Sequence, residues 1–414
     1  MSRGSEQAWV LDGFLRSGGL DALHPQSTKS FEMMMSLDAT DIKRVFDRVE
    51  AAPMMPKAWA EVAEEMEKKG RHYAERGNRN AAFECYRRAT TLWGRAQYSI
   101  FDNNDPRKLP LRLRTNSCMD AFIELAPAPI ERVTIEFEGS SVYGLLHLPQ
   151  TGSGASPMVV LIPGMDMIKE DFNRFAQQEL CSRGFAVLTL DGPGQGETLY
   201  AGLHVTTDNY ERAVSAMIDA VVGDPRIDAA RIGCFGCSWG SYMGVRVAAH
   251  DARIKVLATT VGHYGDSKRA FEQAQPKFKA NYMYMTGYTD EARFDEEIAA
   301  RMELLSVAPN IRCPVLMSIG EFDELTALSS AFAVYESIDA PKELVVWEQE
   351  FHGMGGVTAE SLMLTVDWLE RGLRGEIAAG HAEQVYMKRN GDAQVGSARP
   401  AWWSAAEVEA GGVS

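Results

Sequence analysis

Short apolar runs that alternate with helical segments constrain the fold of this chain more than any other feature of its 414 residues. Four of these runs lack the polar alternation of a half-buried strand: Met158–Ile162, Phe185–Leu190, Ile232–Phe235 and Ile254–Val261. Strands buried on both faces are typical of a parallel sheet that helices cover on two sides. We therefore predict an α/β fold, and we expect its sheet to continue through Pro314–Ile319 and Glu343–Trp347.

The intervals between these strands carry helical patterns. We expect helices near Glu170–Arg183, near Asp208–Val222, directly after Ser238, near Thr326–Ile338, and from about Thr358 to Leu373. Ahead of the apolar runs, Glu131–Glu138 and Ser141–Leu148 alternate with period two around Gly139. This alternation predicts two antiparallel strands at the start of the sheet.

Residues 1–125 are predicted to form a separate helical domain. Apolar residues recur at helical spacing from Pro56 to Gly77 and again from Phe83 to Ile100, which predicts a helical hairpin. A linker near Ala126–Pro129 then leads into a sheet domain that we expect to span residues 126–380. The polar stretch 381–414 is predicted to be a tail, either disordered or docked through Trp402 and Trp403.

The sequence Gly236-Cys237-Ser238-Trp239-Gly240 follows an apolar strand and precedes a helix. A Gly-x-Ser-x-Gly motif in that setting is a nucleophile elbow, in which a strained turn lifts the serine hydroxyl clear of the sheet. Glycines flank the serine because larger side chains would collide in such a turn. We therefore predict Ser238 as the nucleophile of a hydrolase.

An acid and a base follow in the order that such a serine requires. Asp323 comes after the strand Pro314–Ile319, and His352 comes after the strand Glu343–Trp347, so both are expected on the same edge of the sheet as Ser238. His352 would take the serine proton, and the Asp323 carboxylate would orient the imidazole. Glu321 and Glu324 are rival acids, and we prefer Asp323.

A tetrahedral oxyanion needs hydrogen-bond donors aimed at it. The turn itself offers the backbone N–H of Trp239. The loop after the strand Met158–Ile162 begins Pro163-Gly164-Met165, and it predicts the backbone N–H of Met165 as the second donor, with Gly164 allowing close approach.

The regular alternation breaks between about His263 and Asn310. This stretch, 263–310, is rich in phenylalanine, tyrosine and methionine and follows the strand after the nucleophile. It is either a lid inserted over a pocket or a set of ordinary packing helices, because these residue types serve both.

Other motifs and the overall charge exclude several functions. A formal net charge of −15 without a Lys/Arg cluster argues against nucleic acid as a partner. No apolar run reaches the length of a membrane helix, and the start lacks a secretory apolar segment, so we expect a cytoplasmic protein with no membrane partner.

Cys234 and Cys237 lack further metal ligands at zinc spacing, and the Gly-rich loop Leu190–Thr198 lacks a nucleotide-binding ending. We predict no metal and no cofactor.

Taken together, the motifs resemble the fermentation-respiration-switch-like α/β-hydrolases. Four features carry this resemblance over about residues 40 to 375: Asp191-Gly-Pro-Gly-Gln-Gly-Glu197, Pro163-Gly-Met-Asp-Met-Ile-Lys-Glu170, the Ser238 turn and the helices ahead of the sheet. The resemblance implies an α/β-hydrolase fold with an N-terminal helical cap over the nucleophile. It also implies the triad Ser238, Asp323 and His352 with oxyanion donors Met165 and Trp239.

Within that family the chain is most similar to members that act in nicotine degradation and in fungal pigment pathways. This similarity implies hydrolysis of a carbon–carbon bond next to a ketone, in an aryl ketone or polyketide-like small molecule. The nicotine-pathway members carry an extra glutamate after the strand that follows the nucleophile, whereas here His263, Tyr264 and Asp266 are the candidates to replace it. Trp93, Tyr98 and Tyr282 are further expected substrate contacts, together with Tyr264.

Other functions use the same residues. A carboxylesterase or lactonase would need the same triad, and an acyltransferase would need it in a site that excludes water. A binding protein with an intact hydrolase shell is an alternative of a different class. The sequence leaves the oligomeric state open, a homodimer included.

Overall fold

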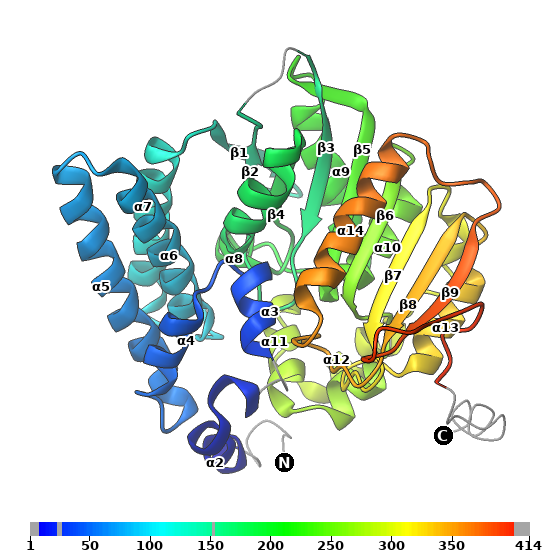
Figure 1. Cartoon of the computed structure of the whole chain (residues 1–414). Helices are drawn as coiled ribbons and strands as arrows, with labels where there is room; N and C mark the ends of the chain where they lie inside the picture. The colour runs from blue at the N-terminus through cyan, green and yellow to red at the C-terminus, as the bar shows by residue number, and fades with distance from the viewer. Residues whose placement is uncertain (1–7, 23–26, 151–153, 401–414) are drawn as a thin grey trace.

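Ten strands form one sheet in a computed structural model that describes residues 8–22, 27–150 and 154–400 (Figure 1). The strands are β1 (Ile130–Phe137), β2 (Ser140–His147), β3 (Ser156–Ile162), β4 (Ala186–Asp191), β5 (Ile227–Ser238), β6 (Ile254–Gly262), β7 (Val315–Gly320), β8 (Lys342–Trp347), β9 (Ala382–Met387) and β10 (Ala393–Val395). Their order across the sheet is β1-β2-β4-β3-β5-β6-β7-β8-β9-β10. The predicted strands are present, and the α/β class is confirmed.

The strand order reverses at β3. From β3 the chain passes to β4 on one side and then to β5 on the other, and both pair with β3 in parallel. The pairs β1–β2, β2–β4 and β9–β10 are antiparallel, and the pairs from β5 to β9 are parallel. In open α/β sheets, ligands bind at the carboxyl ends of strands where the order reverses. The loops after β3 and β5 are therefore the expected place for a site.

Alternate residues of one strand pack on opposite faces of the sheet. Met158, Val160 and Ile162 belong to a buried cluster with α9 (Asn209–Val221), α10 (Trp239–His250) and α13 (Leu328–Ser337). Val159 and Leu161 belong to a second cluster with α14 (Thr358–Leu373) and the N-terminal helices. Because both faces are covered, neither face needs polar residues, and this explains the continuous apolar runs.

The N-terminal region is helical throughout its described part. It contains α2 (Ala8–Gly18), η1 (Gly19–Ala22), α3 (Ser27–Met34), α4 (Ala39–Phe46), η2 (Ala52–Met54), α5 (Met55–Glu75), α6 (Arg79–Tyr98) and α7 (Lys108–Leu125). The predicted hairpin corresponds to α5 and α6, which approach closely where Gly70 faces the ring of Tyr86. We call α5, α6 and α7 the helical layer; it stands beside the sheet at the end that carries β1 and β2 (Figure 1).

Buried ion pairs join this helical layer to the sheet. Arg112 on α7 lies 2.6 Å from Glu170 and 3.1 Å from Glu197, and its side chain is 3% exposed. Lys169 contacts Asp191 at 2.9 Å and Glu197 at 2.7 Å. Charges removed from water are stable only when they are paired in this way, so the five side chains act as one unit.

Two predicted elements differ from the structure. The helix expected near Glu170–Arg183 is instead a succession of short turns: η3 (Lys169–Phe172), the π-helix η4 (Phe175–Leu180) and η5 (Cys181–Arg183). Its first turn is held by tertiary contacts, because Asp171 accepts the N–H of Ile168 and pairs with Arg95 of α6. These contacts take precedence over regular helical geometry.

The prediction of a tail from residue 381 is wrong for its first part. β9 pairs in parallel with β8, and β10 pairs with β9, so residues 382–395 extend the sheet. Val385 and Tyr386 are buried, which anchors this edge of the sheet. Trp402 and Trp403 lie outside the described residues.

The stretch 263–310 contains η6 (Arg269–Gln273), α11 (Pro276–Thr286), α12 (Glu291–Glu297), η7 (Ala299–Arg301) and η8 (Ala308–Asn310), and α8 (Gly196–Tyr200) follows the Gly-rich loop. Phe271, Tyr282 and Phe294 pack their rings together here, with centroids 5.4 to 5.9 Å apart.

Across residues 8–22, 27–150 and 154–400, every helix is too short or too polar to cross a bilayer.

Candidate active site

Ser238 stands at the junction of β5 and α10 in a strained conformation, with φ 55° and ψ −127°. The two flanking glycines make this turn possible. A Cβ on Gly236 would lie 2.1 Å from the carbonyl oxygen of Gly240, and a Cβ on Gly240 would lie 2.2 Å from that of Ile162. Backbone strain of this kind persists only where the surrounding structure enforces it, and here it presents the serine hydroxyl at the sheet edge.

The three residues of the predicted triad form a hydrogen-bonded line. Ser238 Oγ lies 2.8 Å from Nε2 of His352, and Nδ1 of His352 lies 2.8 Å from Oδ2 of Asp323. Oδ1 of Asp323 accepts the backbone N–H groups of Leu325 and Thr326 at 2.8 and 2.9 Å. The carboxylate is therefore held with one oxygen on the imidazole, an arrangement in which His352 can accept the serine proton.

The rival acids Glu321 and Glu324 hold the loop that carries His352. Glu324 Oε2 accepts the backbone N–H of His352 at 2.9 Å, and Glu321 Oε2 accepts that of Gln349 at 2.8 Å. The structure thus brings Asp323 to the imidazole nitrogen and places both glutamates on the backbone beside it.

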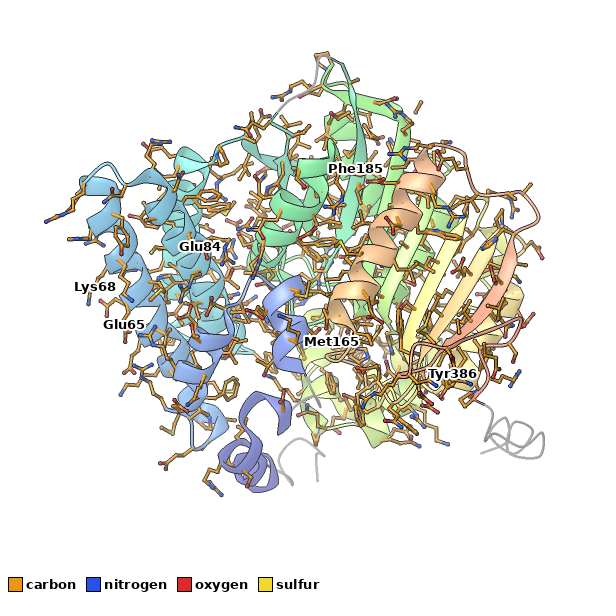
Figure 2. The ribbon with its side chains drawn as sticks, viewed as in Figure 1. Glu65, Lys68, Glu84, Met165, Phe185 and Tyr386 are labelled. Atoms are coloured by element: carbon orange, nitrogen blue, oxygen red, sulfur yellow. The ribbon has the colours of Figure 1, made fainter. Side chains whose placement is uncertain are left out.

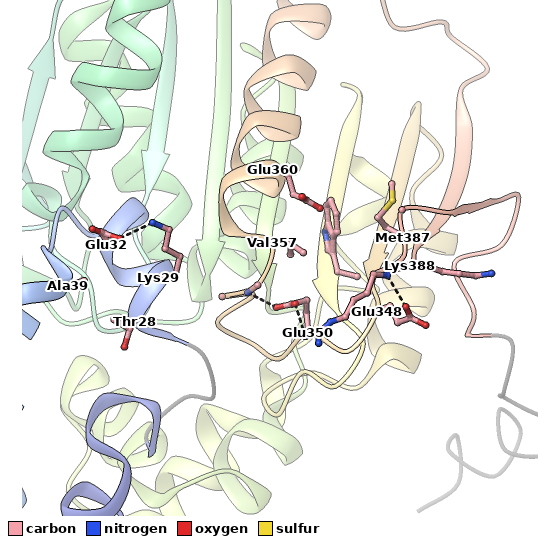
Figure 3. A pocket seen from close by; sticks show the side chains of 15 residues that line it. Thr28, Lys29, Glu32, Ala39, Glu348, Glu350, Val357, Glu360, Met387 and Lys388 are labelled. Atoms are coloured by element: carbon pink, nitrogen blue, oxygen red, sulfur yellow. Dashed lines mark hydrogen bonds and ion pairs between the residues drawn. The ribbon is translucent and has the colours of Figure 1, made fainter. Parts of the chain in front are cut away.

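A third glutamate supports the same loop from behind. Glu350 is 1% exposed; it accepts the N–H of Gly356 at 3.0 Å and pairs with Arg389 at 3.3 Å. These residues border a groove of about 750 Å³ between α3, the start of α14 and the ends of β8 and β9, which Figure 3 shows. None of the predicted site residues lines this groove, so it is separate from the triad.

Burial and charge act in opposite directions on His352. Burial is the largest single effect and lowers its pKa, but Asp323, Glu324 and Asp166 together raise it, and the net effect is a pKa above the usual 6.5. Burial also raises the pKa of Asp323, against the effect of His352. The imidazole is thereby biased towards accepting a proton, as a general base requires.

The predicted oxyanion loop packs directly on the nucleophile. A Cβ on Gly164 would lie 3.2 Å from Cβ of Ser238 and 3.4 Å from the carbonyl oxygen of Cys237, so a side chain would crowd this contact. Met165 follows in the same loop, and Figure 2 labels it near the lower end of α14. Trp239 is the first residue of α10, where backbone N–H groups have no partner within the helix. Both predicted donors border the reversal of strand order at β3.

Three of the predicted substrate contacts are engaged in packing elsewhere. Trp93 lies inside the helical layer, where its indole N–H donates to Glu67 at 3.1 Å and Arg114 covers its ring. Tyr264 is 2% exposed, with its hydroxyl 3.0 Å from that of Thr259. We therefore assign Trp93 and Tyr264 to the core, because their polar atoms already have partners within it.

Asp266 has a similar structural role. Its Oδ2 accepts the N–H of Ala327 at 3.0 Å and the hydroxyl of Ser330 at 3.2 Å, and its Oδ1 accepts the N–H of Arg269 at 3.0 Å. The carboxylate thus joins the stretch 263–310 to the start of α13.

The other three lie close to the triad or to the oxyanion loop. Tyr282 packs edge-on against Trp239, with ring centroids 5.7 Å apart. The hydroxyl of Tyr98 donates to the carbonyl oxygen of Met165. His263 follows Gly262, the β6 residue in register with Ser238, and only 3% of it is exposed.

His263 differs from the other buried groups of the site because part of it lacks a partner. Its Nδ1 lies 2.9 Å from the hydroxyl of Thr326, whereas Nε2 has no hydrogen-bond partner among the described residues. Burial, together with a smaller effect of His352, lowers the pKa of this histidine to about 3. The ring is therefore neutral near pH 7 and offers one free nitrogen.

Sequence reasoning missed two residues that hold the oxyanion loop, Gln195 and Asn281. Gln195 Nε2 donates to the carbonyl oxygen of Gly164 at 2.8 Å, and Asn281 Nδ2 lies 3.4 Å from that of Met165. Gln195 belongs to the Gly-rich loop that the sequence singled out, which was the available signal. For Asn281, on α11, the sequence offered none.

One group of described side chains has metal-ligand chemistry, and it lies away from the triad. Glu343, His381 and Glu383 place one ligand atom each within 4.8 Å of one another at the β8–β9 edge. His381 Nε2 already lies 2.8 Å from Glu343 Oε2, so a side-chain hydrogen bond accounts for the cluster.

The sheet topology, the strained serine and the order Ser, Asp, His along the chain define an α/β-hydrolase enzyme. A model of the FrsA-like esterase family matches residues 56–286, and the chain belongs to that family. A model of the acetyl xylan esterase family also matches residues 204–370. The resemblance predicted from the motifs is confirmed.

Curated relatives include hydrolases of fungi and bacteria. The chain is 30% identical over 215 residues to the 20-hydroxy-prefusarin hydrolase FUS2 of Gibberella moniliformis, covering 50% of this chain and 51% of the relative. It is 27% identical over 313 residues to the 2,6-dihydropseudooxynicotine hydrolase of Paenarthrobacter nicotinovorans, covering 75% and 82%. The chain thus spans about half the length of the fungal relative and most of the bacterial one.

Solved structures agree on the fold. The crystal structure of 2,6-dihydroxy-pseudo-oxynicotine hydrolase superposes with a TM-score of 0.73 at 24% identity, covering 84% of this chain and 97% of that one. AbyA5 superposes with a TM-score of 0.65 at 18% identity, covering 81% and 90%. Both likenesses, at less than 25% identity, show the α/β-hydrolase fold.

Proposed function

We propose that the protein is a serine hydrolase that cleaves a carbon–carbon bond next to a ketone, in an aryl ketone or polyketide-like substrate. The hydrogen-bonded line from Ser238 through His352 to Asp323 is the observation that supports the serine mechanism. The ketone-cleaving character is favoured by the similarity to hydrolases of prefusarin and pseudooxynicotine compounds.

In this proposal the first half-reaction forms an acyl-enzyme. Ser238 Oγ bonds to the substrate carbonyl carbon while its proton passes to Nε2 of His352, and the oxyanion receives the N–H groups of Met165 and Trp239. The carbon–carbon bond then breaks, and its electron pair becomes an enolate on the neighbouring ketone. His352 returns the proton to that leaving group.

The second half-reaction releases the acid. A water molecule gives its proton to His352 and attacks the acyl carbon, and the ester bond to Ser238 breaks with proton return to Oγ. Asp323 stays ionised throughout and stabilises the imidazolium that forms twice in the cycle. The two backbone N–H groups that hold Asp323 Oδ1 favour this ionised state.

His263 supports a substrate with a second polar group. A buried nitrogen without a partner costs free energy, and a ligand that completes the hydrogen bond recovers it. The Nε2 atom of His263 is such a nitrogen, and it belongs to the residue after Gly262, which pairs in register with Ser238. We assign it to a hydroxyl or ketone oxygen of the substrate near the scissile bond.

A carboxylesterase or lactonase is the second candidate, because the two matching family models both describe esterases. It would use the same steps, with an alkoxide in place of the enolate as leaving group.

Product analysis on a matched panel tests the proposal. Aryl β-diketones with and without a ring hydroxyl are compared with aryl esters of the same size, using wild type and Ser238→Ala. We expect diketone cleavage with the higher kcat/KM, dependence on the ring hydroxyl, and loss of all turnover in the variant. Ester cleavage without diketone cleavage would establish the second candidate instead.

A further inference from the structure

The Gly-rich loop Asp191–Glu197 has no role in the steps proposed so far, yet its polar side chains are buried in specific contacts. Gln195 is fully buried between two partners. Its Nε2 donates to the carbonyl oxygen of Gly164 at 2.8 Å, and its Oε1 accepts the hydroxyl of Tyr210 at 2.8 Å. The carbonyl oxygen of Gly164 can only accept, so the amide nitrogen of Gln195 faces the oxyanion loop and its oxygen faces Tyr210.

The contact with Gly164 matters because of peptide geometry. The carbonyl group of Gly164 and the N–H of Met165 belong to the same planar trans peptide, so they point in opposite directions. The carbonyl oxygen of Gly164 also accepts the N–H of Met167 at 3.2 Å. Two donors thus fix the direction of this carbonyl, and with it the direction of the Met165 N–H.

The next peptide of the loop is held by the helical layer and the stretch 263–310. The Tyr98 hydroxyl, at the end of α6, donates to the carbonyl oxygen of Met165 and lies 2.8 Å from Oδ1 of Asn281. Nδ2 of Asn281, on α11, lies 3.4 Å from the same carbonyl oxygen of Met165. Tyr98 is 7% exposed and Asn281 3%, so water competes little for these contacts.

We propose that Gln195 and Tyr98 are positioning residues that hold the Met165 N–H towards the oxyanion. This inference rests on the proposed hydrolase function, and it gives the Gly-rich loop and the helical layer a part in turnover. Gln195 fixes the peptide that carries the donor, and Tyr98 fixes the peptide that follows it. Tyr98, predicted as a substrate contact, is thus reassigned to the oxyanion loop.

The expected effect lies in the chemical step. Losing one oxyanion donor costs about 10² to 10³ in kcat, and loosening a donor that stays in place costs less. We expect about a 10- to 100-fold lower kcat for Gln195→Met and about 10-fold for Tyr98→Phe, with KM within about threefold of wild type. The pH midpoint of kcat/KM should not move, because His352 and Asp323 are untouched.

The experiment measures ester turnover and the rate of Ser238 phosphonylation by a fluorophosphonate, whose developing negative charge needs the same donors. Wild type, Gln195→Met and Tyr98→Phe are compared with Tyr284→Phe. Tyr284 is a matched control, since its hydroxyl joins α11 to Asn103, in the connection between α6 and α7, without reaching the oxyanion loop. Tyr210→Phe tests the same contact from the other end and covers the case in which Gln195→Met fails to fold.

The outcomes separate the inference from the function on which it rests. Slower labelling and lower kcat in the two variants, with the control and all melting temperatures near wild type, support the inference. Labelling and kcat equal to wild type would overturn it. A rise in KM with unchanged kcat would also overturn it, because that pattern marks a substrate contact. Wild type that does not label at Ser238 would instead overturn the proposed hydrolase function.

Discussion

Side-chain reach decides which acid in the sequence Glu321-Phe-Asp-Glu324 serves His352. Asp323 places one oxygen on the imidazole, while the glutamates on either side reach past it to backbone N–H groups of the histidine loop. The three carboxylates therefore position His352 together, one through its ring and two through the backbone of its loop. Asp323 holds the Nδ1 side of the imidazole and stabilises its protonated form, and the glutamates hold the backbone of the loop.

This division predicts unequal effects of removing each charge. Asp323→Asn is expected to lower kcat by about 10⁴. The amide favours the wrong tautomer of His352, and it carries no charge to stabilise the imidazolium. Glu321→Gln and Glu324→Gln keep an oxygen that can accept the same N–H, so we expect changes of less than about fivefold. Steady-state kinetics on one ester measure all three variants. If either glutamine variant lost more kcat than Asp323→Asn, that glutamate and not Asp323 would be the acid of the triad.

The charge around His352 also predicts a pH dependence. The imidazole acts as a base only when neutral, and Asp323 holds its pKa above 6.5 although burial lowers it. Activity should therefore fall as the pH decreases through a midpoint above 6.5. Glu324 raises the same pKa, so Glu324→Gln should shift the midpoint to lower pH. Profiles of kcat/KM from about pH 5 to about pH 9 measure both. A midpoint below 6.5 in wild type would contradict the assignment of His352.

At the scale of elements, the strand–turn–helix formed by β5, Ser238 and α10 tolerates almost no added atoms. The two glycines face backbone rather than flexible side chains, at 2.1 and 2.2 Å from the position of an added Cβ. Backbone cannot swing aside as a side chain can. The motif is therefore a packing requirement as well as a catalytic one.

Adding one methyl group at Gly236 tests whether the turn requires glycine. Gly236→Ala should destabilise the protein by about 3 kcal/mol or more, since the strand and helix must separate to admit the Cβ. Gly223→Ala is the matched control: a Cβ there meets nothing within 4 Å, so we expect a change of less than about 1 kcal/mol. Urea unfolding of both variants gives the difference. Equal stability would show that the elbow can relax.

These elements also show what the sequence could and could not predict. The strands from β3 to β8 were predictable because burial on both faces leaves continuous apolar runs. β9 was missed because it follows the glycine Gly380 and mixes polar residues with only two buried ones, Val385 and Tyr386. Only two of the six β9 residues are buried, so no continuous apolar run marks this strand in the sequence.

Some residues of the candidate site were predictable from the sequence, and others were not. Ser238, Asp323 and His352 could be placed because chain order and strand ends fix which residues meet at one edge. Trp93 was misjudged because an apolar stripe on a helix looks alike whether it lines a pocket or a core. The contact of Gln195 with Gly164 joins two loops 31 residues apart, and no local pattern encodes it.

At the scale of the whole molecule, the helical layer is joined to the sheet by buried charges near the candidate site. Arg112 reaches from α7 to Glu170 and Glu197, and Lys169 connects these to Asp191. Lys169 and Glu170 follow the oxyanion loop directly in sequence, and Asp191 and Glu197 bracket Gln195. Docking of the helical layer and the shape of the site are therefore coupled through one ion cluster.

Breaking this cluster should cost more than breaking any surface pair. Arg112→Met leaves Glu170 and Glu197 short of a partner, and we expect a loss of about 3 to 5 kcal/mol of stability. Lys68→Ala, which removes an exposed pair with Glu64 on α5, is the control and should change stability by less than about 1 kcal/mol. Thermal and urea unfolding measure both. Similar values for the two variants would show that the cluster contributes little.

Glu170 makes the stability that this cluster contributes depend on pH. Burial raises its pKa, but Arg112 and Lys169 lower it more, to about 2 against a usual 4.5. A depressed carboxyl pKa stabilises the folded state above the usual value, and this stabilisation is lost as the pH falls from 4.5 towards about 2. The stability difference between wild type and Arg112→Met should therefore narrow over that range.

The most direct test of the account is the turnover number of Ser238→Ala. The substitution removes only the hydroxyl oxygen of a residue whose turn is fixed by its glycine neighbours, so the fold and melting temperature should stay near wild type. The account predicts a kcat lower by about three orders of magnitude or more on every substrate that the wild type cleaves. A folded Ser238→Ala protein that retains wild-type turnover would contradict the serine mechanism.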